Sequence, residues 1–184
     1  MRSLLCLLIC GLLLTGTLVS CDRKRVPPPS AMEILTAMQA AMTDTAQSLP
    51  DGLSYTRGVD GESPSYLTDT LFSALYGQAA RGLFQPDSGE GGEGVPPIGD
   101  AALFLSISPY PCELAVFRCS DLRSAATVAG LCAARLDTVA RGYRGSEWEA
   151  VARGGKVTVD GCYVLLAVAE DPDTVLACAK RLLP

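Results

Sequence analysis

In the second half of the chain, apolar residues alternate with polar ones or run together, as they do in β-strands. This pattern predicts four strands, at residues 102–108, 112–119, 156–159 and 162–169. Asp160-Gly161 lies between the last two, and an Asp-Gly pair between apolar strands predicts a hairpin. Since residues 164–168 are apolar throughout, we expect the last strand to lie inside the sheet.

Helical periodicity follows each pair of strands. Ser120-Asp121 can cap a long helix that runs to about Gly142, with apolar residues along one side. Ser146 and Glu149 have the spacing of a capping box and open a short helix, and Asp171-Pro172 starts the last helix. The order strand, strand, helix is thus repeated, which predicts an α+β fold: a four-stranded antiparallel sheet with helices on one face.

Two further helices are expected before the sheet. Ser30 and Glu33 form a capping-box pattern, and an apolar stripe along residues 31–48 indicates one face of a helix. Its methionines could serve a binding surface, but a place in the core is the commoner role. A second helix is expected over residues 64–77, with Ser63 as its cap.

The segment between these helices and the sheet has the composition of a loop. Residues 85–100 are rich in glycine, proline and acidic residues. The glycine spacing is not that of a phosphate-binding loop, no Lys-Ser or Lys-Thr follows, and the acids would repel phosphate. We expect residues 30–184 to form a single α+β domain around this loop.

The N-terminus has the pattern of a bacterial lipoprotein signal. Residues 1–20 combine a basic start, a leucine-rich segment and small residues. Leu18-Val19-Ser20-Cys21 fits a lipobox, so we expect cleavage between Ser20 and Cys21 and a diacylglycerol, with fatty acids such as palmitate, on the Cys21 thiol. The apolar segment is shorter than the ~20 residues of a transmembrane helix. Residues 21–29 would be the lipidated cysteine and a proline-rich tether, which holds the chain on the extracytoplasmic face of the cell membrane.

Composition excludes several classes of function. The formal net charge is −5, and the chain has no histidine. An acidic chain lacks the cationic surface that nucleic acids require. Without histidine, neither a Ser-His-Asp nor a Cys-His nucleophile can form, and no zinc site can use histidine ligands. We therefore expect no cofactor and no nucleic acid; the expected partners are the membrane, through the lipid on Cys21, and an envelope protein.

Five cysteines other than Cys21 remain once the signal is removed: Cys112, Cys119, Cys132, Cys162 and Cys178. They form no Cys-x-x-Cys motif, and free buried thiols are the simplest expectation. If the second and fourth strands pair antiparallel, however, Cys119 falls opposite Cys162. These two could then form a disulfide on the oxidising side of the membrane.

Two groups of side chains are candidates for catalysis or binding. A glycosidase needs two carboxylates, and five acids could supply them: Glu147, Glu149, Glu170, Asp171 and Asp173. Each lies near a helix start, where it would serve the backbone amides and the helix dipole instead. Tyr143 and Trp148 flank a loop between two helices and could contact a ligand or partner, although a lone Trp more often covers the core.

Three segments carry a resemblance to a known family: Glu113-Leu-Ala-Val-Phe-Arg118, the long helix with Arg135 and the following Arg141-Gly-Tyr143, and residues 161–171. In these, residues 30–184 resemble an uncharacterised family of small lipoproteins from Gram-positive gut bacteria, known as a domain of unknown function (number four-three-five-eight). The resemblance implies a lipid anchor and a capped first helix. It implies no catalytic residues, and the extra cysteines and the glycine-acid loop depart from the family pattern.

These observations favour a non-enzymatic binding or accessory module that is anchored at the cell surface. A carboxylate-dependent hydrolase of envelope polymers is the first alternative, and it requires a cleft with two converging acids. A small solute-binding lipoprotein is the second, although the chain is short for the two lobes and hinge of such proteins.

Overall fold

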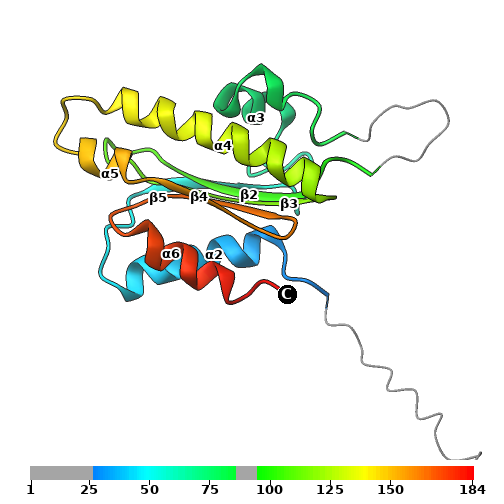
Figure 1. The fold of residues 1–184 in the computed structure, drawn as a ribbon, viewed down its shortest axis with the longest axis horizontal. Helices are drawn as coiled ribbons and strands as arrows, with labels where there is room; N and C mark the ends of the chain where they lie inside the picture. Colours follow the sequence, from blue (N-terminus) through cyan, green and yellow to red (C-terminus); the bar gives the residue numbers. More distant parts are fainter. Residues whose placement is uncertain (1–26, 86–94) are drawn as a thin grey trace, which may run out of the picture.

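The computed structural model describes residues 27–85 and 95–184, so the predicted signal, the Cys21 lipidation site and most of the tether lie outside the described residues. Helices and strands are labelled as in Figure 1. The elements in chain order are α2 (Ala31–Asp44), β1 (Gly52–Thr56), α3 (Asp69–Tyr76), the 3-10 helix η1 (Gln78–Ala80), β2 (Ile98–Ser106), β3 (Glu113–Cys119), α4 (Leu122–Gly142), α5 (Glu149–Arg153), β4 (Lys156–Asp160), β5 (Tyr163–Val168) and α6 (Pro172–Lys180).

The sheet is antiparallel throughout and has five strands, in the order β1-β2-β3-β5-β4. The predicted α+β class is confirmed, but the prediction of four strands is wrong. The additional strand, β1, follows Pro50-Asp51, in a segment for which the sequence pattern predicted no strand. Its first residue, Gly52, passes so close to β2 that a Cβ there would lie 2.3 Å from the ring of Phe104, so a turn-forming residue is also required within the sheet.

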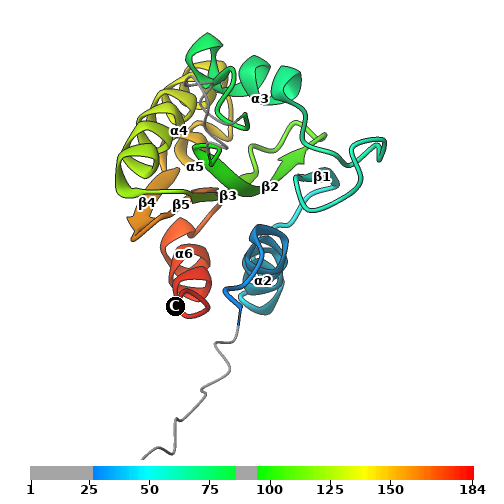
Figure 2. The ribbon, with the colours of Figure 1, turned by 90° about the vertical axis from the view of Figure 1, so that its right-hand side faces the viewer.

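Helices cover both faces of the sheet, whereas the sequence predicted helices on one face. Figures 1 and 2 show α3 and α4 above the sheet and α2 and α6 below it, with α5 beside the C-terminal end of α4. The reason lies in β3 and β5, which are apolar on both sides and almost completely buried. Each side must be removed from water, so each needs its own layer of helices.

The two faces accordingly carry two separate hydrophobic clusters. One cluster lies between the sheet and α2 and α6, and it contains Leu114, Val116 and Leu165. The other lies between the sheet and α3 and α4, and it contains Phe117 and Leu166. Successive residues of β3 thus enter opposite clusters, as the period of two in a strand requires.

Several local predictions are confirmed in kind and shifted in position. The capping box of α2 forms: the Glu33 amide donates to Ser30 Oγ at 3.2 Å, and the Ser30 amide donates to Glu33 Oε2 at 2.7 Å. The helix ends at Asp44 rather than at residue 48, because Ala46 has a φ of 55° and leaves the helical region. In the β4–β5 hairpin the two turn residues are Gly161-Cys162, since Asp160 still pairs with Tyr163.

Two predicted helix starts are wrong. Helix α3 begins at Asp69 with Thr68 as its cap, not at residue 64 with Ser63 as the cap. Backbone hydrogen bonds of Thr56 with Ser65 and Leu67 hold the preceding segment alongside β1 instead. The capping box predicted for the short helix does not form either, because the Glu149 carboxylate accepts from the amide of Gly145.

Candidate functional site

A carboxylate and a guanidinium meet on the α4 side of the sheet. Glu113 begins β3, and its side chain lies on the same side as Phe117 and is only 5% exposed. Arg135 comes from the middle of α4, and its Nε and Nη2 donate to Glu113 Oε2 at 2.9 and 2.8 Å. A charge this deeply buried needs such a partner, since removing it from water alone would cost several kcal/mol.

A tyrosine from α3 completes the arrangement. The Tyr76 hydroxyl donates to Glu113 Oε1 at 3.1 Å, and Arg135 Nε also approaches Oε1, at 3.2 Å. Burial, followed by the charge of Glu113, raises the pKa of Tyr76, so its hydroxyl stays protonated and remains a donor. We call these three residues the Glu113 cluster; it joins β3, α3 and α4.

The guanidinium of Arg135 likewise keeps its proton. Burial alone would lower the pKa of Arg135, but the hydrogen bonds to Glu113 and its negative charge outweigh burial and raise the pKa. The Arg135 guanidinium therefore stays charged at neutral pH and cannot take part in a proton relay.

A cavity of about 280 Å³ opens over this ion pair, and we call it the Arg135 pocket. Its charged floor is formed by Glu113 and Arg135, and Tyr143, the residue that ends α4, lies at its side. The rest of the wall is mainly apolar and includes Leu75, Leu105, Val139, Val168 and Cys112. An apolar wall with a few polar groups is the usual composition of a ligand site, although this volume is at the small end of the range.

The one thiol in the wall of the Arg135 pocket is not poised for reaction. Burial, and then the charge of Glu113, raises the pKa of Cys112 to about 12. Because only the thiolate is an effective nucleophile, Cys112 is inert at neutral pH.

The two aromatic residues singled out in the sequence have different environments. Tyr143 is half-buried and lines the Arg135 pocket. Trp148 does not line the pocket. Its ring packs edge-on against Tyr110, with ring centroids 4.9 Å apart, beside the hydrophobic cluster between the sheet and helices α2 and α6. Tyr143 thus lies at the pocket, and Trp148 packs over the core and against Tyr110, which also lines the pocket.

None of the five candidate acids lines the Arg135 pocket. Asp171 caps α6 by accepting from the Thr174 amide, and Glu149 pairs with Arg153. Asp173 pairs with Lys156. Glu147 and Glu170 are exposed. The cleft with two converging acids that a hydrolase would need is not formed by these residues.

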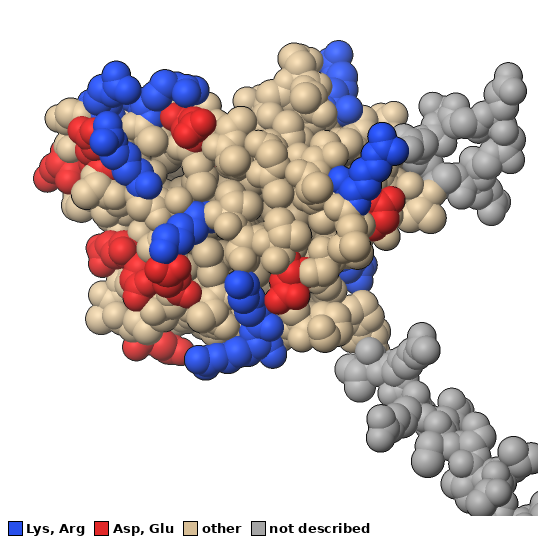
Figure 3. Space-filling model, viewed as in Figure 1, with Lys and Arg blue, Asp and Glu red and all other residues tan. Residues whose placement is uncertain are grey.

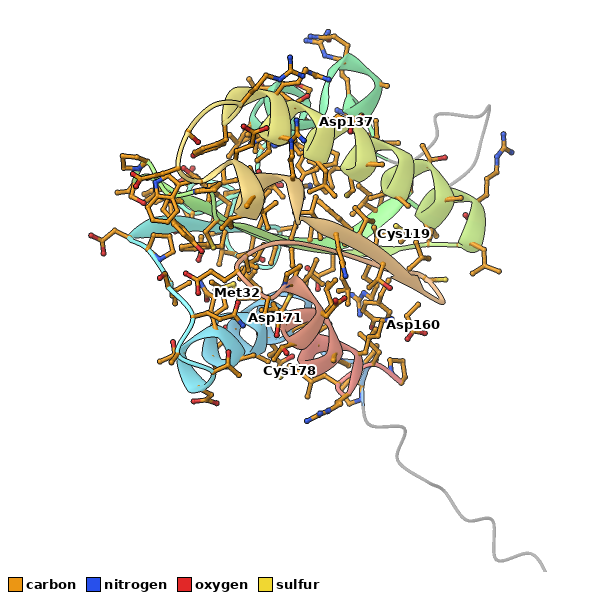
Figure 4. The ribbon with its side chains drawn as sticks, turned by 60° about the vertical axis from the view of Figure 1, so that its left-hand side comes forward. Met32, Cys119, Asp137, Asp160, Asp171 and Cys178 are labelled. Carbon is orange, nitrogen blue, oxygen red and sulfur yellow. The ribbon has the colours of Figure 1, made fainter. Side chains whose placement is uncertain are left out.

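The cysteine register predicted from the sequence is confirmed. Strands β3 and β5 pair antiparallel, and one position beyond their ladder the Cys119 amide donates to the carbonyl of Cys162 at 2.8 Å. Both are free cysteines in this structure. Cys119 lies at the end of the sheet where the β4–β5 hairpin turns (Figure 4). The disulfide itself stays a prediction.

Sequence reasoning named Glu113 and Arg135 only as part of a resemblance, and it did not name Tyr76. One signal was available: Arg135 interrupts the apolar side of α4, between Cys132 and Leu136. A charged residue on a buried stripe indicates a buried partner, but periodicity does not say which one.

Within residues 27–85 and 95–184, no helix has the length and apolar character to cross a membrane. In the same part of the chain, no three His, Cys, Asp or Glu residues are placed to hold a metal ion. Comparison with protein-family models, curated proteins and solved structures found no match. The resemblance to the small-lipoprotein family therefore stays a prediction.

The Glu113 cluster predicts a large difference between two ion pairs. Replacing Arg135 with Met leaves a buried carboxylate without its partner, and we expect it to lower the free energy of unfolding by about 3–5 kcal/mol. The matched control is Arg153→Met, which removes a surface pair with Glu149 whose arginine is 61% exposed; it should cost less than about 1 kcal/mol. Urea unfolding followed by circular dichroism measures both, and equal losses would contradict the role of the cluster.

Native-state alkylation tests the thiols. At pH 8 we expect iodoacetamide to modify the half-buried Cys162 and Cys178 first. Cys119 should react only after unfolding, because burial, and then the nearby Cys162 and Asp121, raise its pKa to about 12 and leave almost no thiolate. Peptide mass spectrometry gives the order of labelling, and equally fast labelling of Cys119 and Cys178 would refute it. If Cys119 and Cys162 both resist alkylation in urea until reductant is added, the predicted disulfide is present.

Proposed function

We propose that this chain is a lipid-anchored, non-enzymatic binding module on the extracytoplasmic face of the cell membrane, and that the Arg135 pocket is its ligand site. The observation that carries the proposal is the Glu113 cluster: a buried carboxylate paired with an arginine whose Nη1 has no acceptor among the described residues, on the floor of a cavity whose other wall residues are mostly apolar. Such a floor supplies directional polar contacts, while the apolar wall supplies burial, which together are the properties of a binding site.

The chemistry of the pocket favours binding over catalysis. Both oxygens of Glu113 already accept hydrogen bonds, so this carboxylate has little capacity left to act as a base. The pKa values of Tyr76 and Cys112 are raised, which keeps both groups protonated. A carboxylate-dependent hydrolase remains the alternative in a different class, but no pair of acids at the pocket supports it.

The position of the pocket suits a tethered module. The described chain begins at residue 27, next to the start of α2, at one end of the domain in Figure 1. The C-terminal end of α4, which contributes Tyr143 to the pocket, lies at the opposite end (Figure 1). A tether over residues 21–29 would therefore leave the pocket directed away from the membrane.

The surface supports a protein or small-molecule ligand rather than a polyanion. On the face shown in Figure 3, basic and acidic side chains lie next to one another around the edge, and the centre is mostly uncharged. A nucleic-acid or polybasic membrane-binding surface would instead gather basic residues on one face. The volume of about 280 Å³ fits a small solute or one large side chain of an envelope protein, so a solute-binding role remains open.

The anchor is tested by labelling with a radioactive or clickable palmitate analogue. Replacing Cys21 with Ser removes the only thiol that a lipobox can modify, so we expect label to be lost and the chain to be released from membranes. The matched control is Cys6→Ser, because Cys6 would leave with the signal; label and membrane association should be unchanged. Loss of label in both variants, or in neither, would contradict lipidation at Cys21.

The ligand site is tested by photocrosslinking in native membranes. A photoreactive phenylalanine analogue in place of Tyr143 should capture a bound partner or ligand, because this position lines the pocket. The same analogue in place of Asp160, at the hairpin end of the sheet, is the control and should capture nothing specific. If the Tyr143 position gives no adduct, or gives the same adducts as the Asp160 position, the pocket is not the binding site.

A further inference from the structure

The guanidinium of Arg135 is only partly used by the protein. Glu113 occupies the side formed by Nε and Nη2. None of the described residues accepts a hydrogen bond from Nη1, and the arginine side chain is 20% exposed. The outer edge of the guanidinium, formed by Nη1 and the second hydrogen of Nη2, therefore has no acceptor among the described residues, and Arg135 lines the pocket. This edge is one of the two forks with which arginine binds two oxygens at once.

The carboxylate of Glu113 has little capacity left to accept a hydrogen bond from a ligand. Glu113 Oε1 accepts from Tyr76 and Arg135, and Oε2 accepts twice from Arg135. The hydroxyl of Tyr143, in the wall of the same pocket, forms no hydrogen bond with the rest of the described chain and can also donate. Ser106 and Tyr110 line the pocket as well, and hydroxyl groups accept as well as donate. Arg135 is the one cationic side chain among the described lining residues, so a ligand that uses it has to supply an acceptor.

We infer that the Arg135 pocket recognises a carboxylate on a small apolar skeleton, an inference that rests on the proposed function. A carboxylate presents two coplanar oxygens to the outer edge of Arg135, and each forms a charge-assisted hydrogen bond. A primary amide presents one oxygen and one further donor, so it leaves an N–H of Arg135 unpaired in a partly buried site, which is costly.

The walls select the remainder of the ligand. Leu105, Val139 and Val168 surround the floor and favour an apolar group of about the size of one amino-acid side chain. Arg135 and Leu75 also line a second cavity, of about 300 Å³, between α3 and α4.

A matched pair of probes tests the inference on the full, membrane-extracted chain. N-acetyl-leucine and N-acetyl-leucinamide share one skeleton and differ only in the carboxylate. We expect titration calorimetry or ligand-observed NMR to show millimolar or tighter binding of the acid, and at least about tenfold weaker binding of the amide, which corresponds to about 1.4 kcal/mol.

Two variants locate the binding. Arg135→Lys keeps the positive charge but loses the pair of parallel N–H donors. It should lower the affinity for the acid at least about tenfold while leaving the affinity for the amide unchanged. Val139→Trp fills the pocket from α4 and keeps both residues of the ion pair, and it should abolish binding of both probes. Circular dichroism shows whether each variant is folded. If the Lys variant does not fold, the Trp variant still decides the test.

The outcomes separate this inference from the proposed function. If the amide binds as well as the acid, and both bindings are lost in Val139→Trp, the pocket is a ligand site but carboxylate recognition is overturned. If the acid binds equally to the parent chain and to Val139→Trp, it binds elsewhere and the inference is overturned. If neither probe binds at millimolar concentration, the inference is overturned as well, and the crosslinking at Tyr143 still decides the proposed function.

Discussion

The buried carboxylate of Glu113 constrains the whole α4 side of the molecule. It can remain charged at 5% exposure only because Arg135 and Tyr76 donate to it. One of these partners comes from α4 and the other from α3, so satisfying a single side chain fixes where both helices lie on the sheet. Replacing such a pair with apolar residues often costs nothing, which suggests that its value lies in selecting one arrangement and in building the pocket floor rather than in overall stability.

The sheet imposes the second constraint. Its apolar strands already imply where the helices must lie, although the prediction drawn from the sequence did not use this. The run of residues 164–168 correctly predicted a strand buried on both faces, and β5 has a neighbour on each side. A strand of that kind requires cover on both faces, which contradicts the expectation of helices on one face. The repeated order strand, strand, helix is present, but α4 and α6 cover opposite faces of the sheet.

The remaining differences arise where long-range contacts decide the local structure. Strand β1 has only five residues and begins with a glycine, so its pattern is too weak to identify; it forms because Gly52 can approach Phe104. The residues of the pocket were not predictable from the sequence for the same reason. Helix α4 contains several arginines, and periodicity does not distinguish Arg135, which pairs with Glu113 22 positions away, from Arg123, which stays exposed. Tyr76, 37 positions from Glu113, gave no local signal at all.

The proposed binding role rests on how completely the reactive groups of the pocket are engaged. A catalytic carboxylate must gain or lose a proton, yet both oxygens of Glu113 are held by donors, one of them permanently charged. A nucleophilic thiol must ionise, yet burial beside that carboxylate keeps Cys112 protonated. What the cluster leaves without an acceptor among the described residues is the outer edge of one guanidinium, which stays charged. The arrangement that stabilises the buried glutamate therefore also provides a charged donor for an acceptor group, and the proposed binding role rests on that donor rather than on a group that exchanges a proton.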